Sequence, residues 1–198
     1  MPAQAVNRSA RAFLFLWHDF RGMTISVRDT RQIRGDRVWI ESVYRDYLND
    51  LAPLGTGLFP ALREIGHREP DQLASWFADS SAHLLTILKE DKPVGFAMVR
   101  SGQAPTDRGA LDYSMSEFFI ARSWRRRGVG QEAVRLIFDR FSGRWHIMEY
   151  LRNPQAVAFW RRVVSAYTAG RYQERSQSGE LHQYFESGAR RARVDPSS

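Results

Sequence analysis

Residues 117–160 carry the sequence EFFIARSWRRRGVGQEAVRLIFDRFSGRWHIMEYLRNPQAVAFW, and the order of elements within it is the most informative feature of the chain. It continues an apolar and aromatic segment over 111–121, whose composition predicts a strand. That strand runs directly into a basic, glycine-containing turn at 125–130. Apolar residues then recur at helical spacing over 129–141, which predicts a helix that begins at the turn.

The second half of this stretch adds another strand and another helix. Gly143 is a typical stop after a helix, and the apolar residues of 145–151 predict a strand. Asn153 suits a helix N-cap and Pro154 suits the first helical position, so we expect a helix that extends to about residue 166. The predicted order is therefore strand, turn, helix, strand, helix.

The turn is a candidate anion site. Gly128 and Gly130 allow the backbone to approach a ligand closely, and the first N–H groups of the following helix lack intrachain partners. Arg125, Arg126 and Arg127 add positive charge that suits phosphate. A basic turn that merely connects a strand to a helix would have the same pattern, so the motif alone leaves both interpretations open.

The rest of the chain is predicted from the same periodicities to combine short strands and helices. In chain order we expect a strand at 23–28, a helix at 36–51, a loop at 52–66, a short helix at 70–77, a hairpin of strands 83–88 and 94–100, a polar loop at 101–109, and a closing hairpin of strands 171–174 and 180–185. We expect one domain over 23–186, an N-terminal extension at 1–22 and a basic, flexible tail at 187–198.

Composition excludes several classes of protein. The 198-residue chain is 43% hydrophobic and 26% charged, as ordinary globular domains are, and it has no cysteine for disulfides, thiolate metal sites or cysteine nucleophiles. We expect no metal, because no metal-binding spacing relates the five histidines, which are His18, His67, His83, His146 and His182. No apolar run approaches the roughly 18 residues of a membrane helix, so we expect a cytoplasmic protein without a membrane partner.

The chain is strongly basic, with a formal net charge of +7. Such a charge favours a polyanionic partner such as RNA or a phosphorylated ligand. All but Lys89 and Lys92 of the 29 basic residues are arginines, however, and a general bias toward arginine would explain the charge equally well.

The stretch from Glu117 to Trp160 resembles the GCN5-related N-acetyltransferase (GNAT) family, through its strand, its R-x-x-G-x-G turn, and a later helix with the pattern N-x-x-A-x-x-F-W. The resemblance covers about residues 23–185. It implies an α/β (α+β) fold, in which helices flank a mixed, mostly antiparallel sheet. It also implies that the sheet is splayed between the two central strands, which end near Ile120 and start near Trp145, to admit a thioester.

The resemblance implies acetyl-CoA as the acetyl donor. The turn would hold its pyrophosphate through backbone N–H groups, the end of the preceding strand would bond the pantetheine arm through its main chain, and the later helix would flank the thiol. The implied cofactor-binding residues are Phe118, Phe119, Ile120, Arg125, Arg126, Arg127, Gly128, Val129, Gly130, Asn153, Phe159 and Trp160.

Glu117 is the candidate general base. An amine acceptor is largely protonated at neutral pH, so attack on a thioester requires a group that removes a proton. Glu117 is out of phase with Phe118 and Ile120 and has apolar neighbours that would raise its pKa. A structural hydrogen bond or ion pair is an equally good explanation of this residue, and Glu149 on the next strand is the reserve candidate.

The family's usual general acid is missing. Many family members have a tyrosine where this chain has Trp160, and an indole N–H has no useful acidity. Tyr150, Tyr167 or Tyr184 would have to protonate the departing thiolate, or it leaves without help. For the acceptor, Asp46 and Asp50 form a candidate cation-binding face on the first helix, although this spacing is also common on solvated helix faces.

We therefore expect an acetyl-CoA-dependent N-acetyltransferase that acts by direct attack of an unidentified amine in a ternary complex. An acyltransferase of the same fold that uses aminoacyl-tRNA is an alternative. So is a non-catalytic nucleic-acid-binding module, whose phosphate contacts would be Arg125, Arg126, Arg127, Arg161, Arg162, Arg190, Arg191 and Arg193. A homodimer is possible in each case.

Overall fold

The computed structural model describes residues 24–51, 69–106 and 109–188. The predicted extension at 1–22, the predicted loop at 52–66 and all but the first two residues of the predicted tail lie outside the described residues. Ser187, placed in that tail by the sequence, is buried and donates a hydrogen bond to the carbonyl of Phe141 over 2.7 Å.

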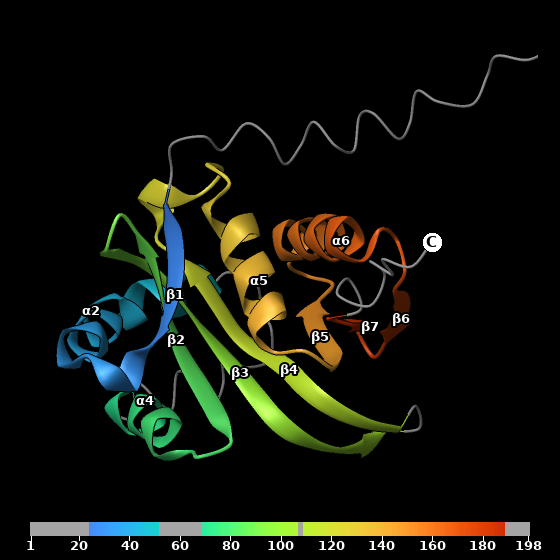
Figure 1. The fold of residues 1–198 in the computed structure, drawn as a ribbon, viewed down its shortest axis with the longest axis horizontal. Helices are drawn as coiled ribbons and strands as arrows, with labels where there is room; N and C mark the ends of the chain where they lie inside the picture. The colour runs from blue at the N-terminus through green and yellow to red at the C-terminus, as the bar shows by residue number, and fades with distance from the viewer. Residues whose placement is uncertain (1–23, 52–68, 107–108, 189–198) are drawn as a thin grey trace, which may run out of the picture.

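The described residues form a seven-stranded sheet flanked by helices, as predicted (Figure 1). In chain order the elements are β1 (Ile25–Asp29), the short 3-10 helix η1 (Thr30–Gln32), α2 (Arg34–Leu51), α4 (Glu69–Ala78), β2 (Ala82–Lys89), β3 (Lys92–Thr106), β4 (Gly109–Ile120), the 3-10 helix η3 (Arg122–Trp124), α5 (Val129–Arg140), β5 (Arg144–Tyr150), α6 (Pro154–Thr168), β6 (Gln173–Gln177) and β7 (Glu180–Glu186). Of the helices in these ranges, none combines the length and apolarity that crossing a bilayer requires.

The strand order is β1-β2-β3-β4-β5-β7-β6, and the sheet is mixed but mostly antiparallel. Only the central pair, β4 and β5, is parallel among the described strand pairs. That pair is joined at three positions, which are Tyr113 opposite Trp145, Ser114 opposite His146, and Met115 opposite Ile147. Beyond these positions the two strands separate, which confirms the predicted splay.

Two predicted boundaries were wrong. The polar loop expected at 101–109 is largely strand, because β3 continues to Thr106 and pairs with the start of β4. The first strand of the closing hairpin lies at Gln173–Gln177 instead of 171–174, and all five of its residues are exposed. Polar and small residues dominate the sequence of both segments, so they lack the apolar alternation from which strands are predicted.

The sheet is covered on both faces. On one face, α2 and α4 bury a cluster that includes Tyr47, Trp76, Phe96 and Phe119. On the other face, α5 and α6 bury a larger cluster around Trp145.

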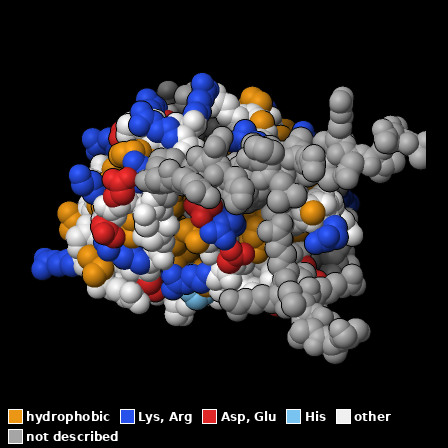
Figure 2. Space-filling model, turned by 45° about the horizontal axis from the view of Figure 1, so that its top comes forward, with side chains coloured by type: hydrophobic (Ala, Val, Ile, Leu, Met, Phe, Trp, Pro, Cys, Tyr) orange, Lys and Arg blue, Asp and Glu red, His pale blue; other side chains and the backbone are white. Residues whose placement is uncertain are grey.

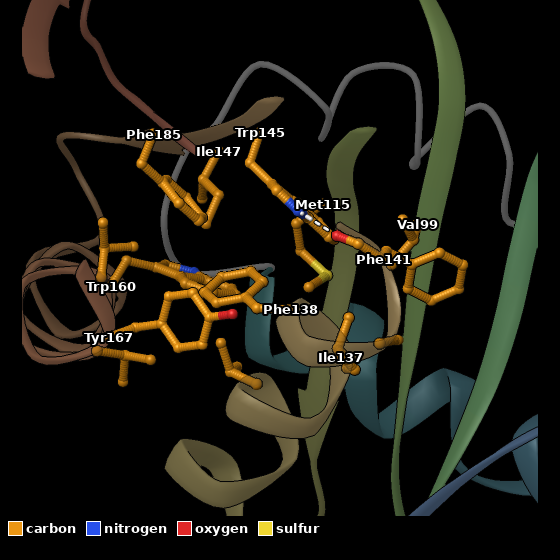
Figure 3. Packing of buried hydrophobic residues seen from close by; sticks show 14 of the residues in the cluster. Val99, Met115, Ile137, Phe138, Phe141, Trp145, Ile147, Trp160, Tyr167 and Phe185 are labelled. Carbon is orange, nitrogen blue, oxygen red and sulfur yellow. Dashed lines mark hydrogen bonds between the residues drawn. The ribbon is translucent and has the colours of Figure 1, made fainter. Parts of the chain in front are cut away.

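Trp145 is fully buried and anchors this second core (Figure 3). Its ring lies 4.8 Å from that of Phe138 and stacks on Phe185, and its indole N–H donates to the carbonyl of Phe141 over 2.9 Å. The strand that carries Trp145 is thereby fixed against α5.

A β-bulge in β4 determines which face its last residues occupy. Met98 of β3 lies opposite Glu117, whereas the next residue, Val99, lies opposite Met115, so Ser116 is the extra residue. Strict alternation would place Glu117 on the same face as Met115. The bulge moves Glu117 to the α2 face and places Phe118 on the α5 and α6 face, with Met115.

Gly95 is required for the close approach of β3 to the end of β4. A Cβ atom at this position would lie 2.7 Å from Cδ1 of Ile120 and would also overlap the carbonyl of Phe119. We expect Gly95→Ala to lower the free energy of unfolding by about 1–3 kcal/mol, because the strands must move apart. The measurement is urea denaturation.

The matched control is Gly35→Ala in α2. No heavy atom would lie within 4 Å of the added Cβ, and alanine favours helix, so stability should be unchanged or higher by up to about 1 kcal/mol. Equal stability of both variants would show that Gly95 is not required for tight packing.

Candidate functional site

The strand edges of β4 and β5 face each other without pairing beyond Met115 and Ile147. The far edge of each strand is occupied, since β4 pairs with β3 as far as Ile120 and β5 pairs with β7 as far as Tyr150. Unpaired backbone N–H and C=O groups at such edges can bond an extended ligand. Main-chain groups at the edges that face the separation can therefore bind a ligand, while the other edge of each strand is held by its pairing.

The R-x-x-G-x-G turn lies where β4 ends and α5 begins. Gly128 is the N-cap of α5 and has φ 76°, in the left-handed region, and Arg126 also has a positive φ of 59°. Gly130 has a different role, because a Cβ there would lie 3.3 Å from the ring of Phe159 and 3.5 Å from Ile120. One glycine thus shapes the turn, and the other allows α6 and β4 to approach the start of α5.

The arginines of this turn do not all extend into solvent. Arg125 donates to the carbonyl of Ile120 over 2.7 Å and to Asp50 at the end of α2. Arg122 donates to the same carboxylate over 2.6 Å. Burial tends to raise the pKa of Asp50, but the hydrogen bonds from Arg125 and Arg122 lower it overall. Asp50 therefore holds the turn against α2. Its carboxylate, which belongs to the predicted amine-binding face, already forms ion pairs with Arg122 and Arg125.

Basic side chains elsewhere are interspersed with acidic ones. In Figure 2 the visible blue side chains are scattered over the face, with red ones between them. Arg161 on α6 donates to both carboxylate oxygens of Glu174.

His146 and His182 contact each other over 3.0 Å, and burial lowers the pKa of His146 to about 4. Within the described ranges, no three acidic or histidine side chains form a cluster that could hold a metal ion.

Glu117 lies on the α2 face at the edge of the separation. Its carboxylate accepts a hydrogen bond from the hydroxyl of Tyr47 on α2. Burial raises the pKa of Glu117 to about 7, although the bond from Tyr47 and the charge of Arg100 act in the opposite direction. The pKa of Tyr47 is itself raised well above its usual value, first by burial and then by Glu117, so the hydroxyl stays protonated and continues to donate. A carboxyl group with this pKa exchanges protons at neutral pH.

Tyr47 could not have been assigned as the partner of Glu117 from the sequence. The two residues are 70 positions apart, and Tyr47 shares the helical spacing of the core residues around it. A pair of this kind carries no local signal, because only the packing of α2 on the sheet brings it together.

Aromatic side chains line the other face of the separation. Phe118 stacks on Phe159 of α6, with ring centroids 5.7 Å apart, and meets the edge of Trp160 at 5.4 Å. Asn153 caps α6 as predicted and accepts a hydrogen bond from the N–H of Ala156 over 3.1 Å. The end of β4 and the start of α6 are therefore held together across the separation.

The three tyrosines considered as acids occupy different places. Tyr167 donates to Asp139 over 2.9 Å and packs in the core beside Phe138. Tyr184 stacks on His146, on the face away from that core. Tyr150 lies at the end of β5, and its pKa is raised by burial, then by Glu180 and by Glu117. Tyr150 is thus the member of the three with electrostatic coupling to Glu117.

Glu149, the reserve candidate, is on the opposite face of β5 from Tyr150. Its residue exposure is 5%, and neither carboxyl oxygen has a hydrogen-bond partner among the described residues. Burial and then the charge of Glu174 raise its pKa to about 8, against the opposing influence of Arg161. At neutral pH this group therefore holds a proton, which does not suit a general base.

Comparison with known proteins agrees with this geometry. Residues 41–164 match the model of the acetyltransferase (GNAT) family, whereas no curated protein matches the chain. An acetyltransferase structure from Thermus thermophilus is 18% identical with a TM-score of 0.56, covering 82% of this chain and 97% of its own. A GNAT-family acetyltransferase from Streptococcus agalactiae is 13% identical with a TM-score of 0.58, covering 85% and 96%.

A third structure, spermidine N-acetyltransferase from Vibrio cholerae in complex with CoA and spermine, is 13% identical with a TM-score of 0.53 and covers 82% of this chain and 95% of its own. At these identities the structural likenesses establish the fold alone. The family model, in contrast, spans more than half of the sequence, including the turn, the separated strands and the start of α6. This chain therefore belongs to the GNAT family of acetyltransferases.

Proposed function

We propose that this protein transfers the acetyl group of acetyl-CoA to an amine, by direct attack in a ternary complex, with Glu117 as the general base. The observation that carries the proposal is the partly buried Glu117 carboxylate, which accepts a hydrogen bond from Tyr47 at the edge of the separated strands and has a pKa of about 7. An amine that approaches along the α2 face would give its proton to this group as the new bond forms.

The described residues fit acetyl-CoA as the donor. The edge of β4 that faces the separation, at Phe118 and Ile120, supplies main-chain groups for an extended amide-containing arm, whereas the carbonyl of Phe119 points toward β3. The turn at 125–130 supplies the start of a helix for phosphates. Acetyl-CoA, when bound, would supply an activated acyl carbon. Backbone N–H groups near Ile120 would orient its carbonyl and stabilise developing negative charge.

The nucleic-acid alternatives find less support in the structure. Arg125 and Arg161, two of their proposed phosphate contacts, are paired with Asp50 and Glu174. Arg190, Arg191 and Arg193 lie outside the described residues. A cytoplasmic location, an RNA partner and a homodimer stay predictions from the sequence.

Donor binding can be measured by thermal unfolding with acetyl-CoA, with heparin and ATP as polyanion controls. Acetyl-CoA at 100 times its Kd should stabilise the protein by about 2.7 kcal/mol, which for a domain of this size raises Tm by roughly 5–10 °C. The increase should persist from low to moderate salt. Stabilisation by heparin alone that disappears with salt would instead favour a nucleic-acid-binding role.

The turn can be tested with Gly128→Val. A β-branched residue is strained at φ 76° and would narrow the backbone approach to phosphate, so we expect acetyl-CoA affinity to fall at least about 10-fold by isothermal titration calorimetry. Gly170→Val is the matched control, because Gly170 has φ 78° at the end of α6 and open space around it. Equal affinity in the two variants would remove the turn from the binding site.

The base can be tested by the pH dependence of kcat/KM. The base acts when deprotonated, so activity should rise with pH through about 7 in the wild type, and Glu117→Gln should lower kcat about 100-fold or more.

Tyr47→Phe removes a hydrogen bond that lowers the pKa of Glu117. The rise in activity should therefore move to higher pH than in the wild type.

Tyr44→Phe removes a hydroxyl from the same core and retains the bond between Tyr47 and Glu117. It should leave the midpoint of the pH profile in place. Full activity of Glu117→Gln at neutral pH would show that another group is the base.

A further inference from the structure

Three buried acceptor atoms lie on one face of β5 and β7 without a donor. They are both carboxyl oxygens of Glu149 and Oε1 of Gln183, and among the described residues they are the buried side-chain atoms that lack a hydrogen-bond partner. Gln183 lies opposite Ile147, so it is a diagonal cross-strand neighbour of Glu149 on the same face. An ionised carboxylate would leave this site with acceptors only.

The charged neighbours do not compensate for a negative charge on Glu149. Arg161 of α6 is the cation that acts on it, but its guanidinium donates to Glu174 of β6 at 2.6 and 3.0 Å. Glu174 repels a second negative charge and also accepts a bond from Nε2 of Gln183 over 3.1 Å. An unpaired buried carboxylate costs several kcal/mol, so Glu149 rests as a neutral carboxylic acid.

This acid lies at the separated part of β5. Glu149 is two residues beyond Ile147, the last β5 residue paired with β4, and it shares the face of Ile147 toward α5 and α6. Glu117 lies on the opposite face, with Tyr47. One carboxyl group thus lies on each side of the opening between the strands, and the one on the side of Trp160 carries the proton that an indole cannot supply.

We propose that Glu149 is the general acid that protonates the thiolate leaving group. The assignment rests on the proposed acetyl transfer. As the bond from the amine nitrogen to the acyl carbon forms, the nitrogen loses its proton to Glu117. The carbon–sulfur bond then breaks with its electron pair on sulfur, and the sulfur takes the proton of Glu149. After the products leave, Glu117 gives its proton to solvent and Glu149 regains one from solvent.

The acidity of Glu149 suits this step. Its pKa of about 8 is close to the roughly 8.5 of a simple thiol, so the proton can pass to the thiolate without a large energetic penalty. Tyr150 is on the same side of the opening as Glu117 and would meet the acceptor amine instead.

The test compares wild type with Glu149→Gln, which keeps the shape of the side chain and removes the acidic proton. We expect kcat to fall about 100-fold, with the Kd of acetyl-CoA by calorimetry changed less than about 2-fold. Wild-type kcat should decline above about pH 8, and this alkaline decline should be absent in the variant. Unchanged kcat with an unchanged alkaline decline would overturn the assignment.

If Glu149→Gln does not fold, a second variant and a spectroscopic measurement test whether Glu149 is the general acid. Glu174→Gln removes a charge that raises the pKa of Glu149, so the alkaline decline should move to lower pH, and an unmoved decline would count against the proposal. Infrared spectra of this variant and the wild type should show a protonated carboxyl band at neutral pH that disappears at lower pH in the variant than in the wild type.

These outcomes separate the two proposals. A protein that shows the infrared band but neither binds acetyl-CoA nor acetylates amines would refute the proposed function, and the acid assignment with it. A protein that binds acetyl-CoA and acetylates amines with unaltered kcat in Glu149→Gln would refute the acid assignment alone.

Discussion

The parallel pairing of β4 with β5 at only three positions is the constraint on which the rest of the molecule depends. Two parallel neighbours need a crossover, and here α5 makes it, so the helix must start where β4 ends. The opening between the strands and the positively polarised helix N-terminus are therefore brought to the same end of the sheet. Antiparallel pairing of β4 with β3 and of β5 with β7 holds the far edge of each of these strands.

The two carboxyl groups beside this opening differ because their surroundings differ. Burial raises the pKa of both groups, but the Tyr47 hydroxyl and the charge of Arg100 lower that of Glu117, whereas the charge of Glu174 raises that of Glu149 further. Their pKa values of about 7 and about 8 follow from these neighbours and suit a base and an acid at neutral pH. The bulge at Ser116 places Glu117 on the α2 face of the sheet. This single extra residue therefore puts the two carboxyl groups on opposite faces.

The net positive charge of the chain says little about its function, although arginine is abundant. Several arginines act within the fold: Arg28 bonds the buried Asp36 at 2.6 Å, and Arg31 bonds four backbone carbonyls around the end of α4, including that of Ala82 over 2.7 Å. Arg125 joins α2 to the turn in the same way. A planar guanidinium with five donors suits this structural use, and net charge does not distinguish it from ligand binding.

The sequence alone determined the elements whose side chains follow a local rule. Helical spacing identified α5, the Asn153 cap and Pro154 identified the start of α6, and the turn of 125–130 identified the family. It failed for the extension of β3 to Thr106, whose polar and glycine-containing sequence predicts a loop although its backbone pairs with β4. The partner of Glu117, the pairing of Arg125 with Asp50, and the isolation of Glu149 were decided by the tertiary structure. The physical reason is that hydrogen bonds and desolvation act through space, between residues that no spacing along the chain connects.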